Sequence, residues 1–133
     1  MTAADRRRRA HDDGLAAERL AALWLRLKGY RVLARRWRCH LGEIDLVAYR
    51  PSFRLKATKD SASGTLVAVE VKRRADEAAA LDAVTLRQRE RIARAAEVFL
   101  RAHPRLNGCA VRFDVVAVIP GRWPLHVADA WRP

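Results

Sequence analysis

The chain has 133 residues, half of them apolar and 32% charged, which suits one compact domain with a hydrophobic core and leaves too little chain for two. This composition excludes an intrinsically disordered protein. The 27 Lys and Arg residues outweigh 15 Asp and Glu residues, and the resulting net charge of +12 favours a polyanionic partner such as nucleic acid.

The N-terminal part of the chain predicts a basic arm followed by an ordered domain. Residues 1–11 include a run of arginines without apolar periodicity, and we interpret them as a flexible arm. Residues 12–133 are expected to form a single domain. Within it, the segment 51–64 is rich in Ser, Lys and Gly and predicts an exposed hairpin loop.

The first predicted helix begins at Asp12 or Asp13, either of which would serve as its N-cap, and runs to Lys28, with Gly29 as its stop. Glu18 lies roughly opposite the main apolar stripe on a helical wheel, inside a second apolar patch. The stripe expected to face the core consists of Ala16, Leu20, Leu23, Trp24 and Leu27. The second patch consists of Ala21, Ala22 and Leu25. A helix that is apolar on two sides suggests the sheet on one side and a second copy of the chain, as in a homodimer, on the other.

The remaining elements predict an α/β fold. Strands are expected at 30–38, 43–49, 65–73, 111–119 and 125–130, and a second helix at 82–103, where Pro104 stops it. Three successive strands followed by a helical crossover imply a mixed sheet flanked by helices, in the order αβββαββ.

The two cysteines and the charge pattern indicate the cellular compartment in which the protein is expected. Cys39 and Cys109 form no Cys-x-x-Cys pair, which disfavours both a disulfide scaffold and a zinc site, and a reducing cytoplasm is the expected compartment. Charged residues such as Glu18 and Arg26 interrupt each apolar stretch after the arginine run, so we expect no signal peptide and no contact with a membrane.

Two neighbouring predicted strands carry the candidate chemistry. Strict alternation places Glu43, Asp45 and Val47 on one face of the strand 43–49, and Glu70 and Lys72 together on one face of the strand 65–73. The opposite face of the first of these strands would carry Ile44, Leu46 and Ala48. If the strands pair, Asp45 and Glu70 lie side by side and repel each other. Lys72 offsets part of this repulsion, and a hard divalent cation would offset more.

These residues also carry a resemblance to a known family. Asp45 in GEIDLVA and Glu70-Val71-Lys72 in VAVEVKRR resemble the PD-(D/E)xK nuclease motif. Residues 12–131 resemble the bacterial YraN family of restriction-endonuclease-like proteins, which is related by motif to Holliday junction resolvases. The resemblance extends to GLAAERLAALWLRLKGY, RIARAAEVFL and RFDVVAVI. It implies a restriction-endonuclease-like αβββαβ core, in agreement with the order of elements above.

The resemblance implies an endonuclease that binds Mg²⁺ or Mn²⁺ and hydrolyses phosphodiester bonds of DNA, with branched or damaged DNA as one interpretation. Asp45, Glu70 and the carbonyl of Val71 would hold the metal ion, and Lys72 would orient water or stabilise developing charge. Ile44 replaces the Pro of the motif, but that position supplies no ligand.

Two further polar residues are weaker candidates. Glu18 matches the first-helix glutamate of the resolvase-like group, which would assist metal binding, and an ordinary surface glutamate is an equal alternative. Gln88 shares a sector of the second helix with Ile92 and Phe99, so its amide should point inward. It would either be satisfied by the backbone or reach towards the site.

Arginines provide candidates for phosphate contact. Arg73 and Arg74 directly follow the Glu-x-Lys motif and would flank the site, which makes them the candidate nucleic-acid-binding residues. The outward ridge of the second helix is interpreted as a solvated face. It consists of Arg87, Arg91, Arg94 and Arg101.

Two alternatives to an enzyme remain open at this point. The first is a nucleic-acid-binding module on the same fold, in which Glu70 and Lys72 form a structural ion pair. The second is a protein interaction partner that uses the apolar back of the first helix.

Overall fold

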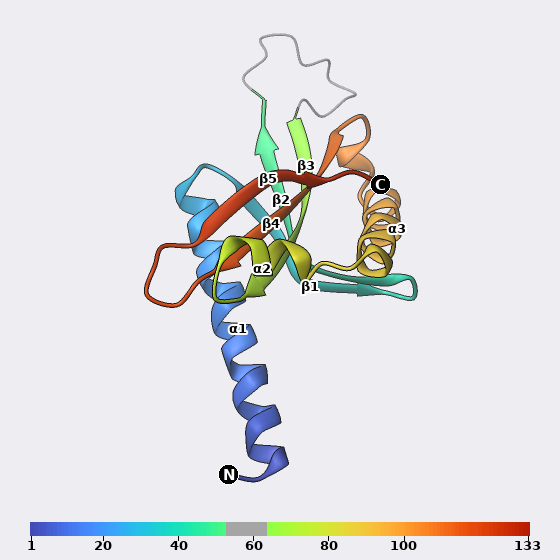
Figure 1. The fold of residues 1–133 in the computed structure, drawn as a ribbon. Coiled ribbons are helices and arrows are strands. Elements are labelled where there is room, and N and C mark those ends of the chain that lie inside the picture. Colours follow the sequence, from blue (N-terminus) through green and yellow to red (C-terminus); the bar gives the residue numbers. More distant parts are fainter. Residues whose placement is uncertain (53–63) are drawn as a thin grey trace.

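The computed structural model describes residues 1–52 and 64–133, so most of the loop expected over 51–64 lies outside the described residues. Figure 1 shows the elements in chain order. They are α1 (Ala3–Leu27), β1 (Arg31–Cys39), β2 (Gly42–Pro51), β3 (Gly64–Arg73), α2 (Glu77–Asp82), α3 (Leu86–Ala102), a short 3-10 helix η1 (Pro104–Leu106), β4 (Ala110–Val118) and β5 (Leu125–Trp131).

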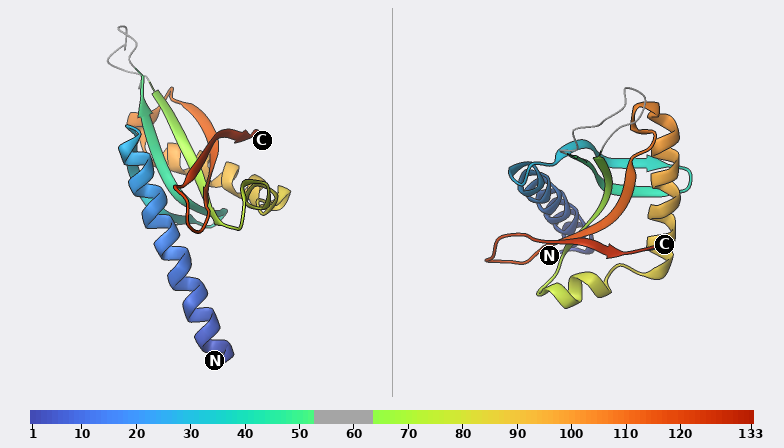
Figure 2. Two further views of the ribbon diagram at one scale, coloured as in Figure 1. Left: turned by 60° about the vertical axis from the view of Figure 1, so that its left-hand side comes forward. Right: turned by 90° about the horizontal axis from the view of Figure 1, so that it is seen from above.

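The five strands form one sheet in the order β1-β2-β3-β4-β5. β3 and β4 are parallel and joined through α2 and α3, whereas the other neighbouring strands are antiparallel. Figure 2 shows α1 on one side of the sheet and α3 on the other. The predicted α/β fold, a mixed sheet flanked by helices, is therefore confirmed. Within the described ranges no helix is both long enough and apolar enough to cross a membrane.

Helix α1 begins at Ala3 and not at Asp12, so the expectation of a flexible arm over residues 1–11 does not hold for the helical residues 3–11. Thr2 and Asp5 form a capping box in which the Thr2 hydroxyl accepts from the Asp5 N–H and the Asp5 carboxylate accepts from the Thr2 N–H. This pair starts the helix, and the arginines that follow are good helix formers. The N-terminal half of α1 projects away from the sheet (Figure 1).

The side of α1 that packs on the sheet is not the predicted one. Of the expected core stripe, Leu20, Leu23 and Leu27 are 37%, 52% and 71% exposed. The buried residues are Ala17, Ala21, Ala22 and Leu25, which pack against the sheet residues Leu46, Ala48, Val67 and Val69. Because alanines let a helix approach a sheet closely, the second apolar patch is the one that is buried. Glu18 lies within this packed side.

The C-terminal end of α1 is as predicted. Gly29 has a φ of 93°, a conformation that costs glycine little. The Gly29 N–H donates to the Arg26 carbonyl, and the Tyr30 N–H donates to the Leu25 carbonyl, 3.0 Å in each case. This pair of hydrogen bonds is a Schellman motif, which ends the helix and turns the chain into β1.

The second predicted helix, 82–103, begins later than expected, and a short helix that was not predicted precedes it. α2 ends at Asp82, where the prediction has its helix begin, and α3 begins at Leu86 after the N-cap Thr85. The Thr85 hydroxyl accepts from the Gln88 N–H at 3.1 Å. Such a cap supplies a new helix start, which the apolar periodicity alone does not reveal. The predicted end before Pro104 is confirmed.

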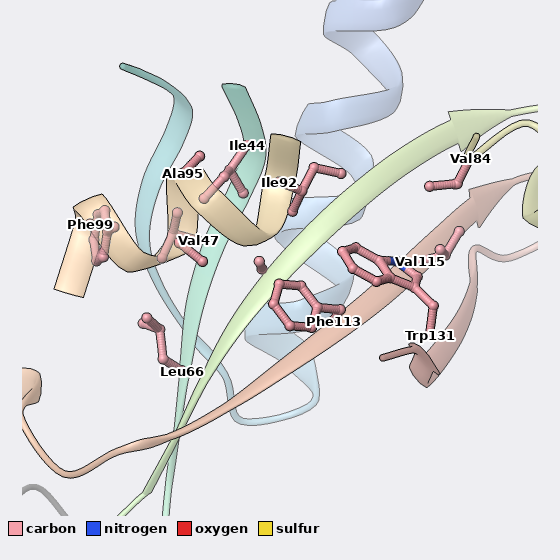
Figure 3. Packing of buried hydrophobic residues seen from close by; sticks show 12 residues of the cluster. Ile44, Val47, Leu66, Val84, Ile92, Ala95, Phe99, Phe113, Val115 and Trp131 are labelled. Atoms are coloured by element: carbon pink, nitrogen blue, oxygen red, sulfur yellow. The ribbon is translucent and has the colours of Figure 1, made fainter. Parts of the chain in front are cut away.

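The core between α3 and the sheet shows where β2 departs from strict alternation (Figure 3). Ile44 and Val47, three residues apart, both pack against α3, whereas Leu46 and Ala48 pack against α1. The expectation that Ile44 shares a face with Leu46 is therefore wrong, as is the grouping of Glu43 and Asp45 with Val47. The break falls at Asp45 and Leu46, because β2 separates from β3 at this point.

We expect Leu25→Ala to destabilise the protein by about 3 kcal/mol, because it removes a fully buried side chain and leaves a cavity. Leu23→Ala, the matched change on the exposed side of α1, should cost less than about 1 kcal/mol. Urea unfolding followed by circular dichroism measures both values. Equal losses would contradict the observed orientation of α1.

Candidate active site

The predicted site residues surround one pocket of about 390 Å³. Its walls are the middle of α1, the first half of β2 and the end of β3. The predicted residues that line it are Glu18, Asp45, Glu70, Val71, Lys72, Arg73 and Arg74. A larger pocket of about 640 Å³ between α3 and the β4–β5 region is mainly apolar and contains none of these residues. The chemistry therefore belongs to the smaller, polar pocket.

The pocket exists because β2 separates from β3. The two strands pair from Pro51 and Gly64 to Leu46 and Val69, and their pairing ends there. β3 itself continues, paired with β4. Beyond Leu46, the Asp45 carboxylate takes the place of a strand partner and accepts a hydrogen bond of 2.8 Å from the Val71 N–H. The carboxylate is thus held by the backbone of the neighbouring strand.

Glu70 is held from the α3 side of the sheet. It is only 5% exposed, and its Oε1 accepts a hydrogen bond of 2.7 Å from the Gln88 amide. The ammonium of Lys72 lies 3.4 Å from the same oxygen. The prediction that Gln88 points inward is confirmed, and its partner is a site carboxylate rather than the backbone.

Asp45 and Glu70 strongly affect each other's protonation. Burial, together with the negative charge of Asp45, raises the pKa of Glu70 to about 8, and the Lys72 ammonium opposes this rise. Burial also raises the pKa of Asp45, although hydrogen bonds from the Val71 N–H and with Glu70 oppose it. Both shifts favour the protonated form, so this pair holds a proton more tightly than an exposed carboxyl group does.

The carboxylate oxygens of Asp45 and Glu70 are ligands that suit a hard divalent cation. Two adjoining carboxylates that hold a proton against repulsion can exchange it for a metal ion, and Val71 lines the same pocket. Nowhere in residues 1–52 and 64–133 do three His, Cys, Asp or Glu side chains gather closely enough to bind a metal on their own. Carboxylate oxygens suit an ion such as Mg²⁺, which takes few protein ligands and keeps several waters.

Glu18 enters the pocket from α1. Its side chain is 15% exposed and lies 3.4 Å from the Arg36 guanidinium. Burial raises the pKa of Glu18, the charge of Asp45 adds to this rise, and Arg36 opposes it. The alternative of an ordinary surface glutamate is therefore wrong, because the side of α1 that carries Glu18 is the packed one.

Arg36 belongs to the site, although the sequence did not point to it. It adopts a φ of 52° within β1, a strained conformation for a residue with a side chain. Its guanidinium lies 3.4 Å from Glu18 and 4.0 Å from Glu43. Arginine has no preference for this conformation, so no local pattern could have revealed it.

Arg73 and Arg74 lie at the rim of the pocket and are exposed, as expected for residues that contact phosphates. Arg73 donates to the Asp13 carboxylate at 3.4 Å, which links the end of β3 to α1. Arg74 donates to the Arg73 carbonyl at 2.8 Å. Both guanidinium groups thus keep hydrogen-bonding capacity for a ligand.

A second buried carboxylate, Asp114 in RFDVVAVI, lies outside the pocket. It is fully buried and accepts hydrogen bonds from the Arg112 guanidinium, the His126 ring and the Asp129 N–H, at 2.7–2.9 Å. Arg112 also donates to the Tyr30 hydroxyl at 2.6 Å. This cluster joins β4, β5 and the segment after α1, so Asp114 is structural.

Comparison with known proteins gives the family. The sequence profile of the uncharacterised protein family UPF0102 matches residues 17–118, which include Glu18, Asp45, Glu70, Lys72 and Gln88. The chain belongs to the UPF0102 family. This confirms the family, known also as YraN, that the sequence motifs indicated.

Curated UPF0102 proteins from other bacteria align with most of this UPF0102 chain. A UPF0102 protein of Parvibaculum lavamentivorans is 48% identical over 120 residues, which cover 90% of this chain and 81% of the relative. The UPF0102 protein amb4503 of Paramagnetospirillum magneticum is 49% identical over 124 residues, 90% and 86% of the two chains. The UPF0102 protein Mmar10_3014 of Maricaulis maris is 46% identical over 127 residues, 96% and 91% of the two chains.

The protonation of Glu70 predicts a pH dependence of stability in this UPF0102 protein. Its pKa rises from an ordinary 4.5 to about 8, so its contribution is fully present below about 4.5 and is lost as the pH rises through about 8. In EDTA, we expect the melting temperature to fall by on the order of 5 °C between pH 5 and pH 8.5. Differential scanning fluorimetry across this pH range measures the change.

Glu70→Gln should flatten this pH dependence, because a glutamine keeps an acceptor oxygen for Gln88 and Lys72 and carries no titrating proton. Glu97→Gln, at an exposed position of α3, is the matched control and should behave as the wild type does. The same slope in all three proteins would show that Glu70 titrates normally.

Proposed function

We propose that this protein is a metal-dependent nuclease of the PD-(D/E)xK type that hydrolyses phosphodiester bonds of DNA. The observation that carries the proposal is the convergence of Asp45, Glu70 and Lys72 in one pocket, at the point where β2 leaves β3. The net charge of +12 and the two arginines at the rim support a polyanionic substrate.

Asp45 and Glu70, with the carbonyl of Val71, are the residues that would hold Mg²⁺ or Mn²⁺. A bound divalent ion supplies Lewis acidity, which polarises a phosphoryl oxygen and lowers the pKa of a bound water. The raised pKa of Glu70 supports this assignment, because burial and the charge of Asp45 disfavour a second negative charge unless a cation offsets it.

Lys72 has the position for electrostatic catalysis. Its side chain is 16% exposed and its ammonium lies 3.4 Å from Glu70, beside the site where a phosphate would lie. It would orient the attacking water or stabilise the charge that develops on the phosphate. Gln88 acts through Glu70 and is a positioning residue.

Glu18 and the rim arginines complete the proposed roles. Glu18 faces the same pocket from α1 and would bind a water of the metal's shell, while Arg36 offsets its charge. Arg73 and Arg74 would bind phosphate oxygens at the entrance.

One observation favours a second candidate, a DNA-binding module without hydrolytic activity. Among the described residues no three His, Cys, Asp or Glu side chains form a group that could hold a metal ion, and the Lys72 ammonium already lies 3.4 Å from Glu70. Such a module would bind DNA with strong salt dependence and no dependence on metal ions.

Cleavage assays separate the two candidates. We expect wild-type protein with Mg²⁺ or Mn²⁺ to cleave at least one of four labelled DNA substrates: linear, nicked, flapped or four-way. Asp45→Asn, Glu70→Gln and Lys72→Met should each reduce the rate by about 100-fold or more while DNA binding persists. Glu97→Gln should cleave at the wild-type rate. Salt-sensitive binding without cleavage of any substrate would favour the binding module.

Calorimetry tests the metal site without turnover. Titration of Mn²⁺ into the wild type at pH 7.5 should release heat and a proton, since the ion displaces the proton of the Asp45–Glu70 pair. Asp45→Asn should abolish this heat at an unchanged melting temperature. Identical heats from the two proteins would remove the proposed metal site.

A further inference from the structure

A second polar pocket adjoins the candidate active site. It has a volume of about 520 Å³ and lies between the start of β2 and the first turns of α3. Its lining residues are Glu43, Thr85, Arg87, Gln88, Arg91 and Ile92. We call this second pocket the groove. Gln88 lines the groove and donates a hydrogen bond to Glu70, which lines the active-site pocket. The Gln88–Glu70 hydrogen bond therefore marks the boundary between the two.

The groove carries uncompensated positive charge. Arg87 and Arg91 are exposed, and neither lies within 4 Å of an acidic group in the part of the chain that the structure describes. Being four residues apart on α3, they follow each other at about 6 Å along the helix axis. This separation is close to the spacing of neighbouring phosphates along one nucleic-acid strand.

The acidic residue of the groove does not cancel this charge. The Glu43 carboxylate lies 3.3 Å from the Arg38 guanidinium and 4.0 Å from that of Arg36. Its negative charge is therefore balanced from β1, and the guanidinium groups of Arg87 and Arg91 remain available to an anion.

The two walls of the groove are held against each other. A side chain on Gly42, at the turn between β1 and β2, would place its Cβ 2.8 Å from the Arg91 carbonyl oxygen. Only glycine permits this close approach of the β1–β2 hairpin to α3 (Figure 2). Arg91 is thus anchored by backbone contact beside the start of β2, at a set distance from Asp45 and Glu70.

We propose that this groove binds the phosphodiester backbone of a nucleic-acid strand next to the phosphate in the active-site pocket, through Arg87 and Arg91. The identity of the ligand rests on the proposed function. The sequence pattern grouped four arginines into one solvated ridge, and the structure separates them. Arg87 and Arg91 line the groove, whereas Arg94 and Arg101 lie further along α3 outside it. The ligand is therefore a strand long enough to occupy both pockets.

The test compares two double variants that lose the same charge from the same helix. One is Arg87→Gln with Arg91→Gln, and the matched control is Arg94→Gln with Arg101→Gln. The probes are fluorescein-labelled 30-base DNA, single-stranded and duplex, in EDTA so that no cleavage occurs. Fluorescence anisotropy measures affinity between 25 and 200 mM salt, and melting temperatures verify that each variant is folded.

We expect the groove variant to bind about tenfold or more weakly at low salt and the control to change far less. Loss of two phosphate contacts should reduce the slope of log affinity against log salt by about 1.8 for duplex and about 1.4 for single-stranded DNA. Single variants Arg87→Gln and Arg91→Gln should each remove about half of this slope.

A position-specific measurement supplements the affinity data. Uncharged methylphosphonates replace one phosphate of the oligonucleotide at a time. At the one phosphate that Arg91 contacts, a methylphosphonate should weaken binding by the wild-type protein. The same methylphosphonate should not further weaken binding by Arg91→Gln, because that contact is already absent. Additive losses at every position would contradict a direct contact between Arg91 and the strand.

The outcomes separate this proposal from the proposed function. Equal losses in the two double variants, or no DNA binding by the wild type at 25 mM salt, would overturn the groove. A selective loss in the groove variant supports it even if no substrate is cleaved with Mg²⁺ or Mn²⁺, in which case only the hydrolytic function fails. Metal-dependent cleavage with equal binding losses would retain the nuclease and reject the groove.

Discussion

The hydrogen bond between the Asp45 carboxylate and the Val71 N–H is the interaction on which the site depends. Where β2 separates from β3, Val71 loses the backbone partner that a continuous ladder would provide. A buried N–H without a hydrogen-bond partner costs about 1–3 kcal/mol. The Asp45 carboxylate supplies that partner to the Val71 N–H and is itself held in a fixed position. Because β3 continues beside β4, Glu70 remains next to this carboxylate, and the separation of the strands opens the pocket above them.

The site is held from both sides of the sheet. Glu18 reaches it from α1 and Gln88 from α3, although these helices pack on opposite faces. This arrangement is possible only near the end of a sheet, where side chains from both layers can meet around the strand termini. Lys72 lies beside Glu70, and Arg36 lies beside Glu18. Cations of the chain itself thus offset part of the negative charge that these acidic groups bring to the site.

Similar-looking aspartates in apolar strands perform different tasks in this fold. Asp45 lies at a point where strand pairing ends, and it lines a pocket. Asp114 lies within β4, where Arg112, His126 and the Asp129 backbone saturate its oxygens. Nothing remains for a ligand at Asp114. The difference lies in the surroundings of each carboxylate and not in the local sequence, which in both cases is an acid between two apolar residues.

Local patterns in the sequence predicted the succession of the five strands and the two long helices, the stop of α1 at Gly29, the inward orientation of Gln88 and the shared face of Glu70 and Lys72. Each of these follows from local signals, namely glycine conformation, helical periodicity and strand alternation. The capping box of Thr2 and Asp5 was also a local signal, and it shows that the true start of α1 could have been predicted. Long-range contacts set three features that no local pattern contains: the apolar side of α1 that is buried, the point where β2 leaves β3, and the left-handed conformation of Arg36 beside two glutamates. Periodicity shows which residues share a side, whereas the choice between two apolar sides depends on the shape of the opposing sheet. That shape is formed by residues far away in the chain.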